Sequence, residues 1–120
     1  MDSVRGFLLL TPSQSSRRCE LIKTITANVL KQRLENNEVL LIDVREVVEH
    51  AAECIEHACL IPLSEFSLDK LPSLDKPIVI HCRSGMRSEE ACKILLSQDP
   101  SLEVYNLEGG ILAWKKVVWV

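Results

Sequence analysis

One short stretch of the chain, His81-Cys82-Arg83-Ser84-Gly85-Met86-Arg87-Ser88, combines residue types that could carry out nucleophilic chemistry. Cys82 is the candidate nucleophile, because a cysteine becomes a reactive thiolate near neutral pH when its surroundings lower its pKa. Arg83 and Arg87 would supply positive charge, and Gly85 would let the backbone curl so that successive N–H groups point inward. We therefore expect Cys82 at the rim of an electropositive ring that also holds an anionic substrate.

The alternative for Cys82 is a purely structural role, in which the thiol is buried at a strand end and the two arginines are solvated. Two arginines and one glycine within six residues suit an anion cradle better than a hydrophobic core. We therefore favour the role of Cys82 as a nucleophile over a purely structural role.

The position of this loop supports the same prediction. The apolar run Pro77–His81 predicts a buried strand, and the residues after the loop predict a helix whose apolar face contains Ala91, Cys92, Leu95 and Leu96. In an open α/β sheet, ligands bind beyond the carboxyl ends of the strands. The helix that follows adds unpaired N–H groups and a partial positive charge, both of which attract anions.

Strand and helix patterns alternate along the rest of the chain. Thr26 is placed to cap a helix that ends near Asn36-Asn37, and Val39–Ile42 predicts a second buried strand. Further segments are predicted as extended at Cys59–Pro62 and Val104–Leu107, helical at Glu46–Glu53 and Ile111–Val117, and irregular with a helical turn at Ser67–Lys76. This alternation predicts an α/β fold with a central, mostly parallel sheet of about five strands and helices on both faces.

Composition sets further bounds. A chain of 120 residues with 47% hydrophobic and 26% charged residues predicts one globular domain, which we place at 21–120 after a flexible leader at 1–20. The net charge of −3 gives no general attraction to nucleic acid or to an anionic membrane, and the apolar runs are too short to cross a bilayer.

The five cysteines do not have the spacing of a secreted disulfide framework. The apolar block Phe7–Leu10 is shorter than the apolar core of a secretory signal peptide. We therefore expect a flexible N-terminal segment that is not a signal peptide, and a protein that works in the reducing cytoplasm. Cys92 is predicted to lie in the core, and Cys19 is predicted to be an exposed residue of the leader.

With these residues identified, the sequence resembles the rhodanese-like sulfurtransferases over about 95 residues, from Ile25 to Lys116. Three blocks in order carry the resemblance: Leu41-Ile42-Asp43-Val44-Arg45, Cys82 to Arg87, and Asn106-Leu107-Glu108-Gly109-Gly110-Ile111-Leu112-Ala113-Trp114. The resemblance implies the rhodanese-like fold and an activity that moves sulfane sulfur from thiosulfate or a related donor to a thiol or cyanide.

The resemblance also implies roles for the loop residues. Cys82 would carry the sulfur as a persulfide, and the N–H groups of Arg83, Ser84, Gly85, Met86, Arg87 and Ser88 would stabilise its charge. Arg87 and Arg83 would bind the sulfonate end of the donor, because guanidinium groups stay charged and offer paired donors. Phosphatases and arsenate reductases of similar fold have five residues between cysteine and arginine, whereas this loop has four, which favours sulfur transfer.

Asp43 and Arg45 are expected at the end of the neighbouring strand, where they either order the site or form a structural ion pair. The implied chemistry needs no metal and no organic cofactor. The partners would be a small anionic sulfur donor and a thiophilic acceptor, with no nucleic acid and no membrane. Two alternatives stay open: a persulfide relay loaded by a partner protein such as a cysteine desulfurase, and a catalytically silent scaffold.

The stretch Glu49–Ala58 departs from the family pattern. The family usually has glycines where this chain has Glu53 and His57, and a histidine where it has Cys54, so a position that needs positive φ would be strained. His50, Cys54, His57 and Cys59 are also potential zinc ligands, but they lack the spacing of structural zinc sites. We therefore expect no metal there.

Overall fold

A five-stranded sheet with strand order β1-β5-β4-β2-β3 forms the centre of the protein. The computed structural model describes residues 22–119, so the predicted leader and Cys19 lie outside the described residues. The strands are β1 (Lys23–Ile25), β2 (Leu40–Asp43), β3 (Cys59–Leu60), β4 (Ile78–His81) and β5 (Val104–Leu107). Every neighbouring pair of these strands is parallel. The predicted α/β class and parallel sheet are confirmed.

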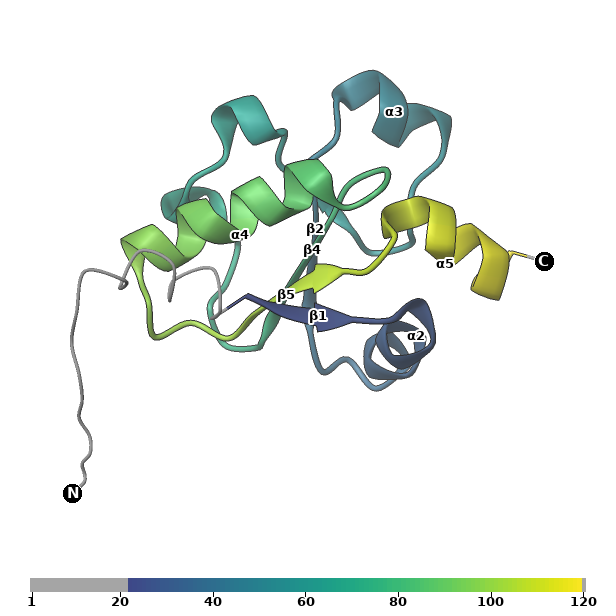
Figure 1. Ribbon diagram of the computed structural model, residues 1–120, viewed down its shortest axis with the longest axis horizontal. Coiled ribbons are helices and arrows are strands. Elements are labelled where there is room, and N and C mark those ends of the chain that lie inside the picture. The colour runs from purple at the N-terminus through teal and green to yellow at the C-terminus, as the bar shows by residue number, and fades with distance from the viewer. Residues whose placement is uncertain (1–21, 120) are drawn as a thin grey trace.

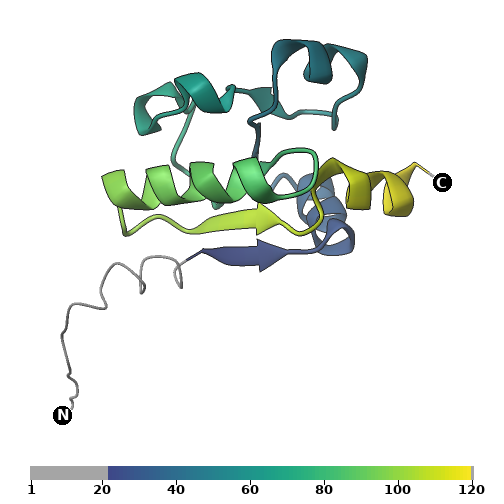
Figure 2. The same cartoon turned by 45° about the horizontal axis from the view of Figure 1, so that its top comes forward.

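Helices cover both faces of the sheet, as predicted. α4 (Met86–Gln98) lies on one face with the 3-10 turns η1 (Leu63–Glu65) and η2 (Leu68–Lys70). α2 (Ala27–Glu35) and α5 (Gly110–Val118) pack together on the other face (Figures 1 and 2). The short helix α3 (Val47–Ala52) lies beyond the end of β2 and has no buried residue. Among the described residues, no helix has the length and apolar character needed to cross a membrane.

The fully buried central strand β4 shows how the sequence divides between two cores. Side chains alternate between the faces of a strand, so Ile78 and Ile80 enter the core under α4, where Cys92 is also fully buried as predicted. Val79 points to the other core, where it packs with residues of α2 and α5. Burial on both faces explains why β4 is a continuous apolar run.

Within residues 22–119, every strand except β1 was predicted from the sequence. No strand was predicted before Thr26, whereas Lys23–Ile25 forms the edge strand β1, which pairs with β5. β1 has three residues and only Ile25 is buried, so it carries no apolar run or alternation from which a strand could be recognised.

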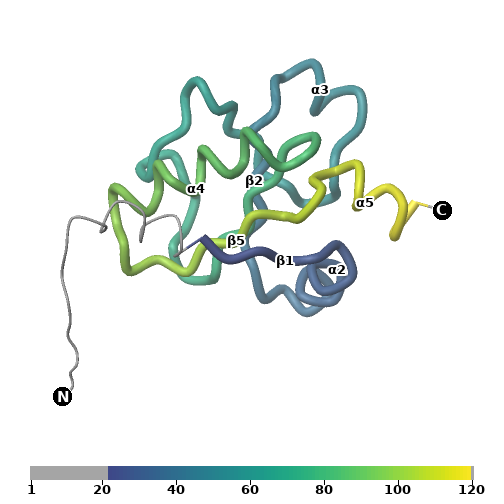
Figure 3. Tube along the Cα trace, viewed as in Figure 1, coloured from purple at the N-terminus to yellow at the C-terminus, as the bar shows by residue number. Residues whose placement is uncertain are grey.

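β2 leads at its carboxyl end into α3, and β5 leads into α5. β4 leads into the stretch from Cys82 to Ser88, which we call the nucleophile loop. In the trace of Figure 3, the turn before α4 lies between α3 and α5. Contacts agree with that view: Arg87 pairs with Glu49 of α3, and Arg83 accepts a hydrogen bond from Leu112 of α5. The parallel sheet thus places the loop where a ligand site is expected.

The segment that departs from the family pattern contains one strained residue. His57 has a φ of 73°, in the left-handed region that favours glycine, whereas Glu53 is extended with a φ of −164°. The predicted strain is therefore present at one of the two positions that lack the family's glycine.

Replacing His57 by glycine is expected to stabilise the fold by about 1 kcal/mol, because the left-handed backbone costs a residue with a Cβ more than it costs glycine. The His57 side chain is 77% exposed, so little packing is lost. Urea unfolding monitored by circular dichroism measures the change.

The matched control is Glu53→Gly. It should lower stability, because glycine is entropically unfavourable in extended backbone and the Glu53–Lys115 ion pair is lost. A His57→Gly variant no more stable than the parent chain would contradict the strain argument.

Candidate active site

The candidate nucleophile Cys82 follows β4 directly, and the loop that it begins curls back over its sulfur atom. Gly85, with a φ of 121°, is the residue before the first turn of α4 and makes the curl possible. Its N–H donates a hydrogen bond to Sγ of Cys82 at 3.0 Å. The Ser88 hydroxyl lies 3.4 Å from the same sulfur.

These contacts favour the ionised form of Cys82. Burial raises the pKa of the thiol, since Cys82 is only 1% exposed. Hydrogen bonds from the Ser88 hydroxyl and from the amides of Ser88, Gly85 and Ser84 act in the opposite direction and hold the pKa below its ordinary value. The loop amides therefore point inward, towards the sulfur.

The expected place of Cys82 at the rim of the ring is wrong. Cys82 is 1% exposed and therefore does not lie open at a rim, and the groups that most strongly lower its pKa are a hydroxyl and backbone amides. The side chain of Arg83 is exposed, and that of Met86 is 79% exposed, so these residues form the outer side of the loop. Sequence alone could not show this, because the burial of Cys82 depends on packing with residues of distant segments such as Ile42, Ile61 and Ala91.

The first turn of α5 holds the loop from behind. The N–H of Ile111 donates to the carbonyl of Cys82 at 2.9 Å, and the N–H of Leu112 donates to the carbonyl of Arg83 at 3.2 Å. Gly110 allows this approach, because a Cβ on it would lie 2.4 Å from the Arg83 oxygen and 2.7 Å from the Cys82 oxygen. In a trans peptide the C=O and the following N–H point in opposite directions, so holding the Arg83 carbonyl turns the Ser84 amide, one of the amides that lower the pKa of Cys82, towards the sulfur.

Asn106, at the end of β5, links the loop to the sheet. Its Nδ2 donates to the carbonyl of Gly85 at 3.0 Å, and its Oδ1 lies 2.5 Å from the hydroxyl oxygen of Ser88. Asn106 belongs to one of the sequence blocks that resemble the family, but no role in the site was predicted for it. The available signal was a polar residue at the carboxyl end of a central strand.

Arg87, expected to hold the donor, is paired with Glu49 of α3. Nη1 and Nη2 of Arg87 lie 2.8 and 3.0 Å from the two carboxylate oxygens of Glu49. The hydrogen bonds from Arg87, followed by the one from the Glu46 amide, lower the pKa of Glu49 to about 2. Glu49 was missed by the sequence analysis, since nothing in the spacing of α3 shows which residue faces the loop.

Asp43 and Arg45 form a buried ion pair beside the loop. Asp43 is fully buried, Arg45 is 3% exposed, and Nη2 of Arg45 lies 2.8 Å from Oδ2 of Asp43. Burial raises the pKa of Asp43, but the hydrogen bonds from Arg45 together with the contributions of His81 and His50 bring the pKa down to about 2. His50 adds a contact of 2.8 Å between its Nδ1 and the same carboxylate.

The four potential zinc ligands of the sequence analysis do not converge. His50 is directed at Asp43, and the side chain of His57 is 77% exposed next to Glu56. Within residues 22–119, no group of three or more His, Cys, Asp or Glu side chains is arranged to hold a metal ion.

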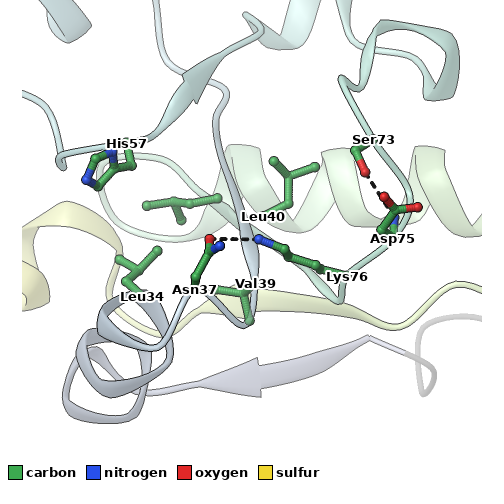
Figure 4. A pocket seen from close by; sticks show the side chains of 9 residues that line it. Leu34, Asn37, Val39, Leu40, His57, Ser73, Asp75 and Lys76 are labelled. Atoms are coloured by element: carbon green, nitrogen blue, oxygen red, sulfur yellow. Dashed lines mark hydrogen bonds between the residues drawn. The ribbon is translucent and has the colours of Figure 1, made fainter.

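Of two cavities in the structure, one borders the nucleophile loop and the other does not. One of about 260 Å³ lies between α3, the loop and α5, and is lined by residues that include Arg45, Glu49 and Arg83. Another of about 610 Å³ is lined by residues that include Leu34, Asn37, His57 and Lys76 (Figure 4). The larger cavity contains no residue of the nucleophile loop, whereas the smaller one borders it.

Comparison with known proteins agrees with this geometry. The profile of the rhodanese-like domain family matches residues 26–117. A sulfurtransferase of Allochromatium vinosum is 39% identical over 99 residues, which cover 80% of this chain and 91% of that protein.

Solved structures show the same likeness. A rhodanese-related protein from Thermoplasma volcanium superposes with a TM-score of 0.68 at 32% identity, covering 78% of this chain and 91% of that one. The human single-domain sulfurtransferase TSTD1 superposes with a TM-score of 0.70 at 25% identity, covering 78% of this chain and 96% of that one. The chain therefore belongs to the rhodanese-like domain family and is of the sulfurtransferase type.

Proposed function

We propose that this protein moves sulfane sulfur from thiosulfate, or from a related donor, to a thiophilic acceptor through a persulfide on Cys82. The observation that carries the proposal is the sulfur environment: the Gly85 N–H donates to Sγ at 3.0 Å, and the pKa of Cys82 lies below its ordinary value. A thiolate is the reactive form of cysteine, and the groups that most lower the pKa of Cys82 are the Ser88 hydroxyl and backbone amides.

The transfer takes two displacements at sulfur. The Cys82 thiolate attacks the outer sulfur of thiosulfate, a new S–S bond forms, and the bond to the sulfonate sulfur breaks so that sulfite leaves with the electron pair. A thiolate or cyanide then attacks the outer sulfur of the persulfide, and Cys82 leaves as a thiolate. In each step the leaving group keeps the electron pair of the broken bond and the transferred sulfur stays at the sulfane level, so no external oxidant or reductant enters the cycle.

The loop residues have distinct roles in this proposal. The amides of Ser84, Gly85 and Ser88 stabilise negative charge on the sulfur of Cys82 and, after loading, on the persulfide. The exposed guanidinium of Arg83 attracts the sulfonate end of the donor. Arg87 can do the same only when it leaves Glu49. Asp43 and Arg45 fix the end of β2 beside the loop and act as positioning residues.

Every group needed for these steps belongs to the chain, so the proposal includes no metal and no organic cofactor. The acceptor is proposed to be cyanide or a thiol, free or on a protein. Because a free thiolate must persist, we propose that the protein works in a reducing compartment such as the cytoplasm.

A persulfide relay is the second candidate function. Two observations favour it: Cys82 is only 1% exposed, and Arg87 is paired with Glu49. Both hinder the binding of a small, free, doubly charged donor such as thiosulfate. In a relay, a partner such as a cysteine desulfurase would load Cys82. Steady-state kinetics distinguish the two functions: an enzyme saturates with thiosulfate, whereas a relay loads quickly only with its protein donor.

Treatment with thiosulfate is expected to add one sulfur atom to the protein at Cys82, because its thiolate is the stabilised one. Intact-protein mass measurement followed by peptide mapping detects the added sulfur. Cys82→Ser is the control, since Cys54 and Cys59 are also free and half-buried. Equal sulfur gain in both proteins would contradict the proposal. No gain with thiosulfate, but gain with a cysteine desulfurase, would replace the enzyme by the relay.

Ser88→Ala is expected to move the pH profile of Cys82 alkylation upward by about one pH unit, because a hydrogen bond to an ionised group is lost. The rate of reaction with iodoacetamide, followed at Cys82 by mass spectrometry between pH 5 and 9, measures the shift. Below the pKa of the parent protein both proteins react slowly, and above the raised pKa the two rates converge.

The matched control is Ser97→Ala, which removes a hydroxyl from the same helix where it bonds only the Ile94 carbonyl. Its profile should coincide with that of the parent protein. A Ser88→Ala profile that also coincides would show that the backbone amides alone hold the thiolate.

A further inference from the structure

The carboxylate of Glu49 is paired with Arg87, the arginine that an anionic donor would need. Its carboxylate receives both terminal nitrogens of Arg87 at 2.8 and 3.0 Å, and the Glu46 N–H donates to the same carboxylate at 2.8 Å. The second contact belongs to the capping box of α3, so the helix itself holds Glu49 in place. The carboxylate is thus fixed from two sides over the loop.

The pairing has the geometry that a sulfonate or another oxyanion would adopt on Arg87. A guanidinium offers two parallel N–H donors to two oxygens of one anion, and here both are used by Glu49. A donor must therefore displace the carboxylate before it can bind Arg87, and the displaced carboxylate would repel it. Both effects weaken the binding of a small dianion.

Displacement is feasible because the pair is only partly buried. The side chains of Arg87 and Glu49 are 35% and 29% exposed, so water reaches both. Ion pairs with this exposure add little to stability, and their partners can exchange. The pKa of Arg87 is raised first by its hydrogen bonds with Glu49 and also by the charge of Cys82, so an anion on Arg87 would be near the nucleophile.

We propose that Glu49 is a specificity-determining residue that competes with the donor for Arg87 and restrains the use of small, free, doubly charged sulfur donors. The inference rests on the proposed persulfide chemistry at Cys82. It differs from a purely supporting role for Glu49, in which the carboxylate would hold Arg87 ready for the donor and its loss would weaken donor use.

Glu49→Gln tests the competition while keeping the length of the side chain and its capping bond, because glutamine also serves at this position of a capping box. The apparent KM for thiosulfate in Cys82 loading is expected to fall about tenfold, the change that accompanies roughly 1.4 kcal/mol of binding. The rate of alkylation by neutral iodoacetamide should stay within twofold of the parent value, since the thiolate contacts are unchanged.

Glu46→Gln is the matched control. This substitution removes the same charge from the start of the same helix, but Glu46 makes no hydrogen bond with Arg87. The KM of Glu46→Gln for thiosulfate should therefore change much less than that of Glu49→Gln. The double variant Glu49→Gln/Arg87→Ala should lose the gain, because the gain acts through the released guanidinium.

An unchanged or higher KM in Glu49→Gln, an equal fall in Glu46→Gln, or a gain that survives in the double variant would each overturn the inference. If parent and variant both fail to acquire sulfur at Cys82 from any donor, the proposed function itself fails. Urea unfolding of each variant shows that the comparison is made between folded proteins.

Discussion

The first turn of α5 holds the carbonyl oxygens of Cys82 and Arg83, and the direction of the amides around the sulfur depends on that contact. The N–H groups in the first turn of a helix have no partner within the helix. Here the N–H groups of Ile111 and Leu112 bond the carbonyls of Cys82 and Arg83, which point away from the centre of the loop. Gly110 lets the backbones meet, since any side chain there would collide with the loop. Asn106 and Ser88 complete the arrangement from β5 and α4.

Charge around the loop is organised in pairs. Asp43 with Arg45, Glu49 with Arg87, and Glu53 with Lys115 each join two charged side chains, and Arg45 also donates to the Glu53 carbonyl. The thiolate of Cys82 therefore depends on hydrogen bonds from the backbone and a hydroxyl more than on an unbalanced positive field. This explains how a chain with a net charge of −3 can stabilise an anion at its centre.

Sequence alone predicted the parts of the structure that local pattern determines. The apolar run that became β4, the glycine that curls the loop, and the helix carrying Cys92 were all predictable, because burial on both faces and helical periodicity leave a mark in the sequence. Glu49 and Asn106 were not predictable, since their roles depend on which strand ends are neighbours. The burial of Cys82 was misjudged for the same reason, since the buried residues that surround it come from distant parts of the chain.

The packing of α5 has a consequence for reactivity. Ile111 and Trp114 anchor this helix in the core that it shares with α2, while its first turn orients the nucleophile loop. Local opening of the C-terminal helix would release both carbonyls at once and let the loop amides rotate away from the sulfur. The pKa of Cys82 is therefore linked to the docking of a hydrophobic helix, and any change that loosens this helix is expected to raise that pKa.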